Sequence, residues 1–383
     1  MNEKGLAKVL IVDDLSTNVE LLQVYLEEEG YNILTASNGK EAWEITQREL
    51  PDIILLDVMM PVMDGYEACR LIKSNTITEN IPVVMVTSLN EVSSRIAGIE
   101  AGADDFLSKP FNIYELLARV RSLIRIKKYN SQILDQNRVF EKELEIAKKV
   151  QEAILPANNE VIFKGLTLHY RYIPSQKLGG DYFNVIQLAD NKIGIFLSDV
   201  MGHGVAASLI TMVLKTLFDN HVHRIDSPSD FLFTLNNELQ KIFGEILIYA
   251  TAIYIIVDQK NRKLYYANGA HPPALLYNNT KSDIMQLQCQ GTILGIFKDT
   301  KYKTIEMSYE PNDQIFLYTD GLTDVENIQE EPFGDERLLK IVGENKELAP
   351  KELIETLLEN LYQFASDESF EDDINILCVR LDD

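Results

Sequence analysis

The segment 126–156 contains no glycine, and no proline before its last residue, and it separates two parts of different pattern. It is rich in Lys, Glu and Gln and carries a net charge of +1, whereas residues 1–125 carry −9 and residues 157–383 carry −15. Because glycine and proline are the residues that most often end a helix, this composition predicts one long helix. We therefore expect three parts: a domain at 1–125, a helical linker at 126–156 and a second domain at 157–383.

The charge of the chain limits its partners. Its 383 residues carry a net charge of −23, which argues against nucleic acid or an anionic membrane as the main partner, because both require a basic surface. No apolar run approaches the roughly 18 residues that span a bilayer, and the N-terminus does not resemble a signal peptide. The cysteines lack the spacing of a zinc site or a disulfide framework: Cys69, Cys289 and Cys378. We expect a cytoplasmic protein.

In the first part, short apolar runs alternate with amphipathic helical patterns. The runs predict buried strands within 8–14, 52–57, 81–88 and 105–110, and the helical patterns cover 18–30, 39–51 and 113–124. Strands that alternate with helices form βαβ units. The expected fold is an α/β doubly wound parallel sheet of about five strands.

Polar side chains follow these strands at the point where each apolar run stops: Asp13 and Asp14, Asp57, Thr87 and Lys109. The carboxyl ends of the strands of an open α/β sheet face one crevice, so we expect these side chains to converge. Three carboxylates in one place repel each other and raise one another's pKa. A hard divalent cation such as Mg²⁺ resolves that repulsion. Such a cation and Lys109 would neutralise an incoming phosphoryl group, with Asp57 as the nucleophile and Thr87 as a hydrogen-bond donor to it.

The motifs DD, D-x-x-M-P-x-M-D-G, T-S and K-P stand in this order between residue 6 and about residue 125. This part resembles the receiver (CheY-like) domain of two-component response regulators. The resemblance implies that Asp57 is the phosphoacceptor and that a sensor histidine kinase or phosphotransfer protein supplies the phosphoryl group. It also implies that Asp14, Asp57 and the Met59 carbonyl hold Mg²⁺, with Asp13 acting mostly through water.

The same resemblance assigns roles to three further positions. Thr87 and Phe106 match the switch pair whose rearrangement reports phosphorylation. Pro110 matches a proline that usually follows the lysine through a cis bond.

The last part has a different pattern. Strands are predicted at 166–173, 192–200, 248–258, 263–270 and 313–321, and helices at 206–222, 228–243 and 350–366. Because the strands cluster instead of alternating with helices, we expect an α+β layered sandwich of antiparallel sheets flanked by helices.

Aspartates again occupy strand ends and turns in this part: Asp181, Asp199, Asp320, and the pair Asp372 and Asp373. No serine elbow, Cys–His pair or metal-spaced histidine cluster accompanies them. Carboxylates with few imidazoles or thiolates favour Mg²⁺ or Mn²⁺ over zinc. Two such ions would supply a hydroxide near neutral pH and hold a phosphate in line for hydrolysis.

The motifs AKKVQEAILP, GGDY, D-V-M-G-H-G, Y-T-D-G and D-D follow one another from residue 147 to the C-terminus. This part resembles the metal-dependent PPM (PP2C-like) serine/threonine phosphatases, and within them the SpoIIE/RsbU-type branch that dephosphorylates anti-sigma-factor antagonists in partner switching. The resemblance implies two or more Mn²⁺ or Mg²⁺ ions. Their implied ligands are the carboxylates of Asp181, Asp199, Asp320 and Asp372 and the carbonyl of Val200, with Gly180 and Gly202 shaping the loops.

This part departs from the pattern of the branch at several positions. Asn184 stands where an acid is frequent, and Asn375 stands where the final motif often has threonine. Met201 occupies the place of a histidine that serves as a candidate general acid in many PPM phosphatases, and we do not assign that role to His203. His271, a lone histidine near a turn, is interpreted as structural.

Apolar residues recur every seven positions in the linker: Ile126, Ile133, Phe140, Ala147 and Ile154. Of the complementary positions four residues on, Asn130, Asn137, Leu144 and Gln151, only one is apolar. A coiled coil with a half-polar core is weakly stable but specific in register. The linker is therefore either a dimeric signalling helix, giving a homodimer, or a spacer that packs on its own domain.

Together the motifs favour a response regulator whose output is a metal-dependent serine/threonine protein phosphatase. A catalytically inactive scaffold that binds a phosphoprotein is one alternative, because of Asn184 and Asn375. The other is a nucleotide cyclase of the GGDEF type, suggested by GGDYF at 179–183, although that signature requires an acid where Tyr182 stands.

Overall fold

The computed structural model describes residues 7–87, 92–156, 159–189, 191–244, 246–280, 283–365 and 370–382. The chain forms two compact units, Met1–Phe140 and Glu141–Asp383, which we describe separately. Within the described residues no helix is long and apolar enough to cross a lipid bilayer.

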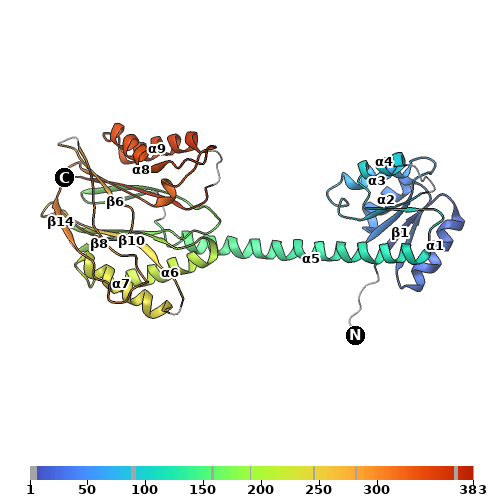
Figure 1. Ribbon diagram of the computed structural model, residues 1–383, viewed down its shortest axis with the longest axis horizontal. Coiled ribbons are helices and arrows are strands. Elements are labelled where there is room, and N and C mark those ends of the chain that lie inside the picture. The colour runs from blue at the N-terminus through green and yellow to red at the C-terminus, as the bar shows by residue number, and fades with distance from the viewer. Residues whose placement is uncertain are drawn as a thin grey trace. The chain divides into compact units, whose positions relative to one another are not determined.

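The first unit contains the predicted parallel sheet. Its five strands lie in the order β2-β1-β3-β4-β5, and every pairing is parallel. The central strands are continuous apolar runs because both faces of the sheet are covered by helices, which confirms the expected α/β fold (Figure 1). The strands are β1 (Lys8–Val12), β2 (Asn32–Ala36), β3 (Ile53–Asp57), β4 (Val83–Thr87) and β5 (Asp105–Ser108).

The helices of this unit follow the strands in alternation. Asn38 and Asp64 cap α2 and α3 by accepting hydrogen bonds from the backbone N–H groups of Glu41 and Glu67, at 3.0 and 2.8 Å, which satisfies donors that have no partner within the helix. The helices are α1 (Ser16–Glu28), α2 (Gly39–Glu49), α3 (Gly65–Lys73), α4 (Val92–Glu100) and the start of α5 (Ile113–Glu152).

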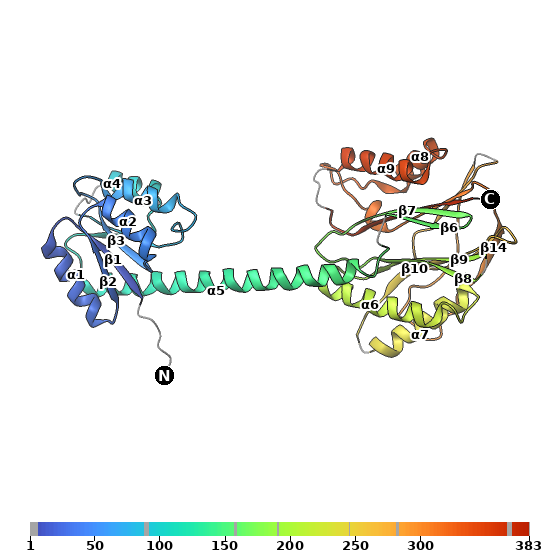
Figure 2. The same ribbon diagram turned by 180° about the vertical axis from the view of Figure 1, so that it is seen from behind.

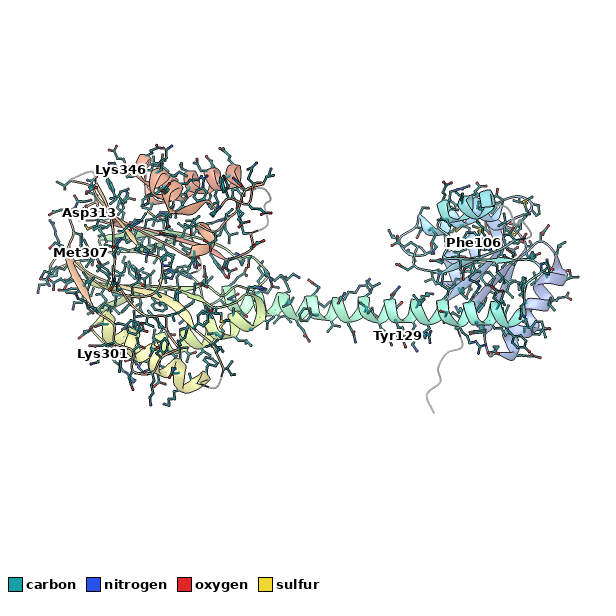
Figure 3. The ribbon with its side chains drawn as sticks, viewed as in Figure 1. Phe106, Tyr129, Lys301, Met307, Asp313 and Lys346 are labelled. Carbon is teal, nitrogen blue, oxygen red and sulfur yellow. The ribbon has the colours of Figure 1, made fainter. Side chains whose placement is uncertain are left out.

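Helix α5 is continuous from Ile113 to Glu152 and contributes to both units. It begins before the predicted linker because Leu116, Leu117 and Val120 are buried in the core of the first unit. Further along, its apolar side chains are exposed, as Tyr129 shows at 57% (Figure 3). The predicted boundary between residues 125 and 126 lies inside this helix, and the one between residues 156 and 157 lies just beyond its end. Both boundaries stay predictions.

The second unit is the expected sandwich of two antiparallel sheets. One sheet has the order β14-β11-β10-β9-β8 and the other β13-β12-β15-β16-β7-β6. The strands are β6 (Glu160–Phe163), β7 (Leu166–Ile173), β8 (Tyr182–Ala189), β9 (Lys192–Val200), β10 (Ala250–Asp258), β11 (Lys263–Gly269), β12 (Leu275–Asn278), β13 (Asp283–Gln286), β14 (Ile305–Ser308), β15 (Gln314–Tyr318) and β16 (Ile374–Leu381).

Helices cover the outer face of each sheet, so this unit has four layers (Figures 1 and 2). One apolar cluster fills the space between the sheets, a second joins the β8–β11 side to α6 (Gly204–His221) and α7 (Pro228–Phe243), and a third joins β12, β15 and β16 to α8 (Gly334–Glu344) and α9 (Pro350–Phe364). A short 3-10 helix, η1 (Asp320–Leu322), follows β15.

Aromatic rings form the centre of the layer between α6 and its sheet. The Phe218 ring lies 5.4 Å from both Phe196 and Phe231 and 6.3 Å from Tyr254. These buried rings contribute area and edge-to-face contacts that hold α6 on the sheet.

We expect the Phe218→Ala variant to lose about 3–5 kcal/mol of unfolding free energy in this unit, because the cavity it leaves among three rings cannot collapse fully. The matched change Phe297→Ala removes a ring that is 61% exposed and should stay within about 0.5 kcal/mol of the parent. Urea unfolding followed by circular dichroism measures both. Tryptophan fluorescence would not, because the single tryptophan, Trp43, belongs to the other unit. Equal losses for the two variants would contradict this description of the core.

Candidate functional site

The structure brings three of the predicted receiver residues into direct contact. Asp13 follows β1, Asp57 ends β3 and Lys109 follows β5, all at the carboxyl end of the sheet. The Lys109 ammonium lies 2.7 Å from Asp13 Oδ2 and 2.6 Å from Asp57 Oδ1. Both carboxylates are buried, with exposures of 4% and 7%. The side chains that parallel strand ends were expected to gather therefore form a charged cluster.

Burial sets the ionisation of this cluster. It raises the pKa of Asp57, an effect that the hydrogen bond and charge of Lys109 oppose and the negative charge of Asp13 reinforces. Burial alone would lower the pKa of Lys109, but its bonds to Asp13 and Asp57 outweigh this and raise it. The site thus holds an excess of negative charge that one ammonium only partly compensates.

Backbone and amide groups orient the two carboxylates. Asp13 Oδ1 accepts hydrogen bonds from the Leu15 N–H and from the Asn18 side chain, both at 3.0 Å. The Met59 N–H donates to Asp57 Oδ2 at 3.1 Å. Asp14 is exposed beside this cluster. Sequence reasoning missed Asn18, although an amide in the first turn of the helix after an acidic strand end was a usable signal.

The predicted switch residues lie on the two neighbouring strands β4 and β5. Thr87 ends β4 and is 4% exposed, and its carbonyl accepts a 2.7 Å hydrogen bond from the Lys109 N–H. The Lys109–Pro110 bond is cis, as the resemblance implied. Phe106, labelled in Figure 3, packs against α4 so closely that a Cβ on Gly98 would lie 2.3 Å from its ring. The role of this pair as a switch stays a prediction.

The second unit gathers the other predicted aspartates where its two sheets meet. Asp181 precedes β8 and Asp199 lies near the end of β9, both in one sheet, whereas Asp320 follows β15 and Asp372 precedes β16 in the other. Thr319 links the two sheets: its hydroxyl donates to Asp181 Oδ2 at 2.8 Å and accepts from the Asn375 N–H at 3.0 Å.

The four aspartates perturb one another's ionisation. Burial raises the pKa of Asp181 well above its ordinary value, and the charges of Asp199 and Asp373 raise it further. Burial, followed by the charges of Asp320, Asp372 and Asp373, raises the pKa of Asp199 to about 7.

The two remaining aspartates also have raised pKa values. Burial raises the pKa of Asp320 and of Asp372, and Asp324 adds to both shifts. All four predicted residues therefore belong to one electrostatic site.

The donor set of this site suits a hard divalent cation, because every donor is oxygen and the excess charge is negative. A Cβ on Gly180 would lie 2.8 Å from the Val200 carbonyl oxygen, so the glycine allows that carbonyl to approach the Asp181 loop. Among the described residues, however, no group of three or more His, Cys, Asp or Glu side chains is close enough together to hold one ion as it stands. The chemistry of the donors fits a metal, whereas their spacing is wider than a coordination shell.

Asp373, which was not among the predicted ligands, holds the loop that carries Asp181. It is 3% exposed, and its Oδ1 accepts from the Ser175 N–H at 2.7 Å. Its Oδ2 accepts from the Gly180 N–H at 2.5 Å. Adjacent Asp372 is more exposed to solvent than Asp373, although its carboxyl group is still partly desolvated. The resemblance implied Asp372 and not Asp373 as a ligand, but it did not predict that Asp373 bonds the loop.

The other residues that the sequence analysis named differ in their burial and in their hydrogen bonds. Asn184 donates to the Tyr182 hydroxyl at 3.0 Å, while the buried side chain of Asn375 has no hydrogen-bond partner among the described residues. His203 is exposed and bonds to Gln176 at 2.8 Å. His271 is buried, which lowers its pKa to about 3, and its Nδ1 lies 2.7 Å from the Thr251 hydroxyl.

A cavity of about 740 Å³ lies beside this site. Gly321, Asp324 and Asp372 line it, and Ile328 and Phe370 contribute apolar surface. The carboxylate centre is thus next to an open space that a large substrate can approach.

Family models match both units. The model described as Stage II sporulation protein E (SpoIIE) matches residues 189–382, and that of the response regulator receiver domain matches residues 9–121. The first unit is 51% identical over 121 residues to the response regulator PleD of Caulobacter vibrioides (strain NA1000 / CB15N), which is 32% of this chain and 27% of that protein. It is 42% identical over 118 residues to the alkaline phosphatase synthesis transcriptional regulatory protein PhoP of Bacillus subtilis (strain 168), 31% of this chain and 48% of that protein.

The chain thus spans only part of the length of these curated relatives. Among solved structures, the SiaA-PP2C domain of Pseudomonas aeruginosa is similar to 64% of this chain and 99% of its own, with a TM-score of 0.57 and 21% identity, which shows a shared fold. The chain belongs to the SpoIIE family, with a PP2C-like phosphatase domain that follows a response regulator receiver domain.

Proposed function

We propose that this chain accepts a phosphoryl group on Asp57 and thereby controls the metal-dependent hydrolysis of phosphoserine or phosphothreonine in a client protein. One observation carries the proposal most directly. Four aspartates from two sheets, Asp181, Asp199, Asp320 and Asp372, have pKa values raised by burial and by the charges of neighbouring aspartates. That accumulation of negative oxygen is costly to a fold unless cations compensate it.

In the receiver, Asp57 is the proposed nucleophile. Its carboxylate oxygen attacks the phosphorus of a phosphohistidine on a sensor histidine kinase or phosphotransfer protein, and the histidine nitrogen leaves. The Lys109 ammonium, already 2.6 Å from Asp57 Oδ1, would bond the transferred phosphoryl group, and the Thr87 hydroxyl would bond it from β4. Asp13, Asp14, Asp57 and the Met59 carbonyl would hold the Mg²⁺ that offsets its charge.

In the phosphatase domain, Asp181, Asp199, Asp320, Asp372 and the Val200 carbonyl would hold two or more Mn²⁺ or Mg²⁺ ions. When bound, such ions supply hydroxide near neutral pH and neutralise the phosphate. Thr319 keeps Asp181 oriented by its 2.8 Å hydrogen bond, and Asp373 holds the Asp181 loop in place. The Met201 side chain is 45% exposed and cannot donate a proton, so the general acid is left unassigned.

The client is proposed from the family. The SpoIIE/RsbU-type branch that this chain resembles dephosphorylates anti-sigma-factor antagonists in partner switching. We extend that substrate class to this chain. The cavity next to Asp372 gives a folded phosphoprotein access to the centre. The cyclase alternative loses its support, because Tyr182 of GGDYF is fully buried with its ring 6.0 Å from Phe196.

A second copy of the chain is the proposed partner of helix α5. The middle of this helix exposes a series of apolar side chains, at 49–58% for each of Ile126, Tyr129, Ile133, Leu134, Val139 and Phe140. An isolated helix gains no packing energy from such residues, whereas pairing with a second helix would bury them.

We expect Mn²⁺-dependent hydrolysis of p-nitrophenyl phosphate to fall by at least about 100-fold in the Asp199→Asn variant, because the change removes a charged metal ligand. The matched control is Asp283→Asn, an exposed residue of β13, which should keep the parental rate. Parental protein without Mn²⁺-dependent turnover would favour the inactive scaffold instead.

Acetyl phosphate is expected to change the rate of client dephosphorylation in the parent, and the Asp57→Asn variant should not respond to it. The substitution removes the nucleophilic oxygen without changing side-chain size. Rates measured with Mg²⁺ and Mn²⁺ present, with and without the donor, give the ratio for each variant. A response that persists in Asp57→Asn would show that the receiver does not act through this residue.

The Ile133→Asp variant should shift the chain from dimer toward monomer, because a carboxylate at a pairing position is desolvated in the dimer. Lys142→Asp, at an exposed position on the opposite side of α5, is the control and should leave the mass unchanged. Sedimentation equilibrium measures both. A parent that is monomeric at micromolar concentration would support the spacer interpretation of the linker.

A further inference from the structure

The first three turns of helix α6 contain no charged residue. The sequence from Gly204 to Leu214 is uncharged, and Lys215 is the first charged residue of the helix. Ala207 and Ile210 pack in the core on the inner side of these turns. A helix that is apolar on all sides is normally covered on all sides. These turns therefore have the composition of a buried helix, although one side of them is exposed.

The side chains on that exposed side are apolar. Val205 is 44% exposed and Leu209 is 63% exposed. Because they are four residues apart, they lie on the same side of the helix, one turn after the other. Helix α9 of the same domain instead exposes Lys351, Glu355 and Glu359. The outer side of α6 thus differs from that of a helix that meets only water.

Met201 extends this apolar surface toward the carboxylate centre. It is 45% exposed and follows Val200, whose carbonyl is a proposed cation ligand. Its backbone N–H donates to the Tyr249 carbonyl at 3.0 Å. This bond places Met201 beside the segment that carries Ile246 and Leu247, which are 64% and 69% exposed. We call the following residues the α6 apolar face: Met201, Val205, Leu209, Ile246 and Leu247.

The loop that joins the centre to α6 is open to solvent. Gly202 and His203 are exposed, and a Cβ on Gly202 would meet no atom within 4 Å. Asp199 and Met201 are two residues apart, which limits the distance between their Cα atoms to about 7 Å. An extended peptide covers about 13 Å in four residues. A peptide whose phosphoresidue reaches Asp199 therefore has its neighbouring residues within reach of the α6 apolar face.

The location of the face favours an occupant that comes and goes. Contiguous exposed apolar side chains commonly mark a protein interaction site. A second copy of the chain held permanently over Met201 would obstruct the approach to Asp199 and stop turnover. A client leaves after each reaction, and the flexible, polarizable side chain of methionine adapts to partners of different shape. The client therefore fits this face better than a second copy does.

We propose that the α6 apolar face is the docking surface for the client, and that it selects clients with apolar side chains within about four residues of the phosphorylated serine or threonine. This inference rests on the proposed function, because it names the kind of segment that the same centre accepts. It also gives a role to Met201, which has no proton to donate and contacts the client instead.

The test compares two synthetic phosphoserine peptides of equal length as substrates of the full chain with Mn²⁺. One has leucine at the second and fourth positions on both sides of the phosphoserine, and the other has serine at these positions. We expect the parent to hydrolyse the leucine peptide with a kcat/KM at least about tenfold higher, mainly through a lower KM, because apolar contacts commonly discriminate substrates to this extent.

The Leu209→Asp variant is expected to bring the ratio of the two kcat/KM values to about one, because an apolar segment would desolvate the new carboxylate. Val205→Asp makes the same kind of change one turn earlier, so a folding defect in one variant does not decide the result. The matched control is Ile162→Asp, at a residue of β6 that is 68% exposed, which should keep the parental ratio. Each ratio is taken within one protein, so a partial loss of active enzyme cancels.

Equal kcat/KM values for the two peptides in the parent would overturn the inference, as would a parental ratio in the folded Leu209 and Val205 variants. Sedimentation equilibrium of the same variants tests the other occupant. A dimeric parent that becomes monomeric in Leu209→Asp, with an unchanged peptide ratio, would assign the face to a second copy and overturn the inference. All these results leave the phosphatase assignment intact. A parent that hydrolyses neither peptide nor p-nitrophenyl phosphate with Mn²⁺ would instead overturn the proposed function.

Discussion

The repulsion between clustered carboxylates is the constraint on which the arrangement of both domains depends. Asp13 and Asp57 lie on either side of one ammonium in the receiver. In the phosphatase domain Asp181, Asp199, Asp320 and Asp372 lie among the charges of neighbouring aspartates, which include Asp324 and Asp373. Each pKa in the second group is raised, which means that the folded state pays for keeping these groups charged at neutral pH. A fold retains such a cost where a function requires it, and divalent cations are the compensation that oxygen donors favour.

The two domains bring their carboxylates together in different ways. In the receiver a parallel sheet brings the ends of four strands to one edge, so residues far apart in the chain meet without special loops. In the phosphatase domain the acids come from two facing sheets, and the meeting has to be built by hydrogen bonds between them. Thr319 and Asp373 supply these bonds, each joining one sheet to the loop of the other. The second site is accordingly more sensitive to displacement of a loop than the first.

Most of the fold follows from local pattern. The buried strands β1, β3 and β4 are predictable as apolar runs, and the amphipathic helices α2, α7 and α9 as periodic apolar faces, because burial demands those patterns. The half-exposed strand β2 and the short helices α3, α4 and α8 give weaker signals and were not individually predicted. The aspartates at strand ends were predictable because an acid after a buried run has few structural reasons to be there. Asn18 and Asp373 were not, since their roles are hydrogen bonds to groups distant in the chain, and no local pattern encodes the partner.

The central claim is that the phosphatase carboxylates share cations. Anomalous diffraction from crystals of the full chain grown with Mn²⁺ tests it most directly. The account predicts anomalous peaks within coordination distance of Asp199 and at least two of Asp181, Asp320 and Asp372. Saturating Mn²⁺ with no peak at these carboxylates, or with peaks only on exposed acids elsewhere, would contradict it.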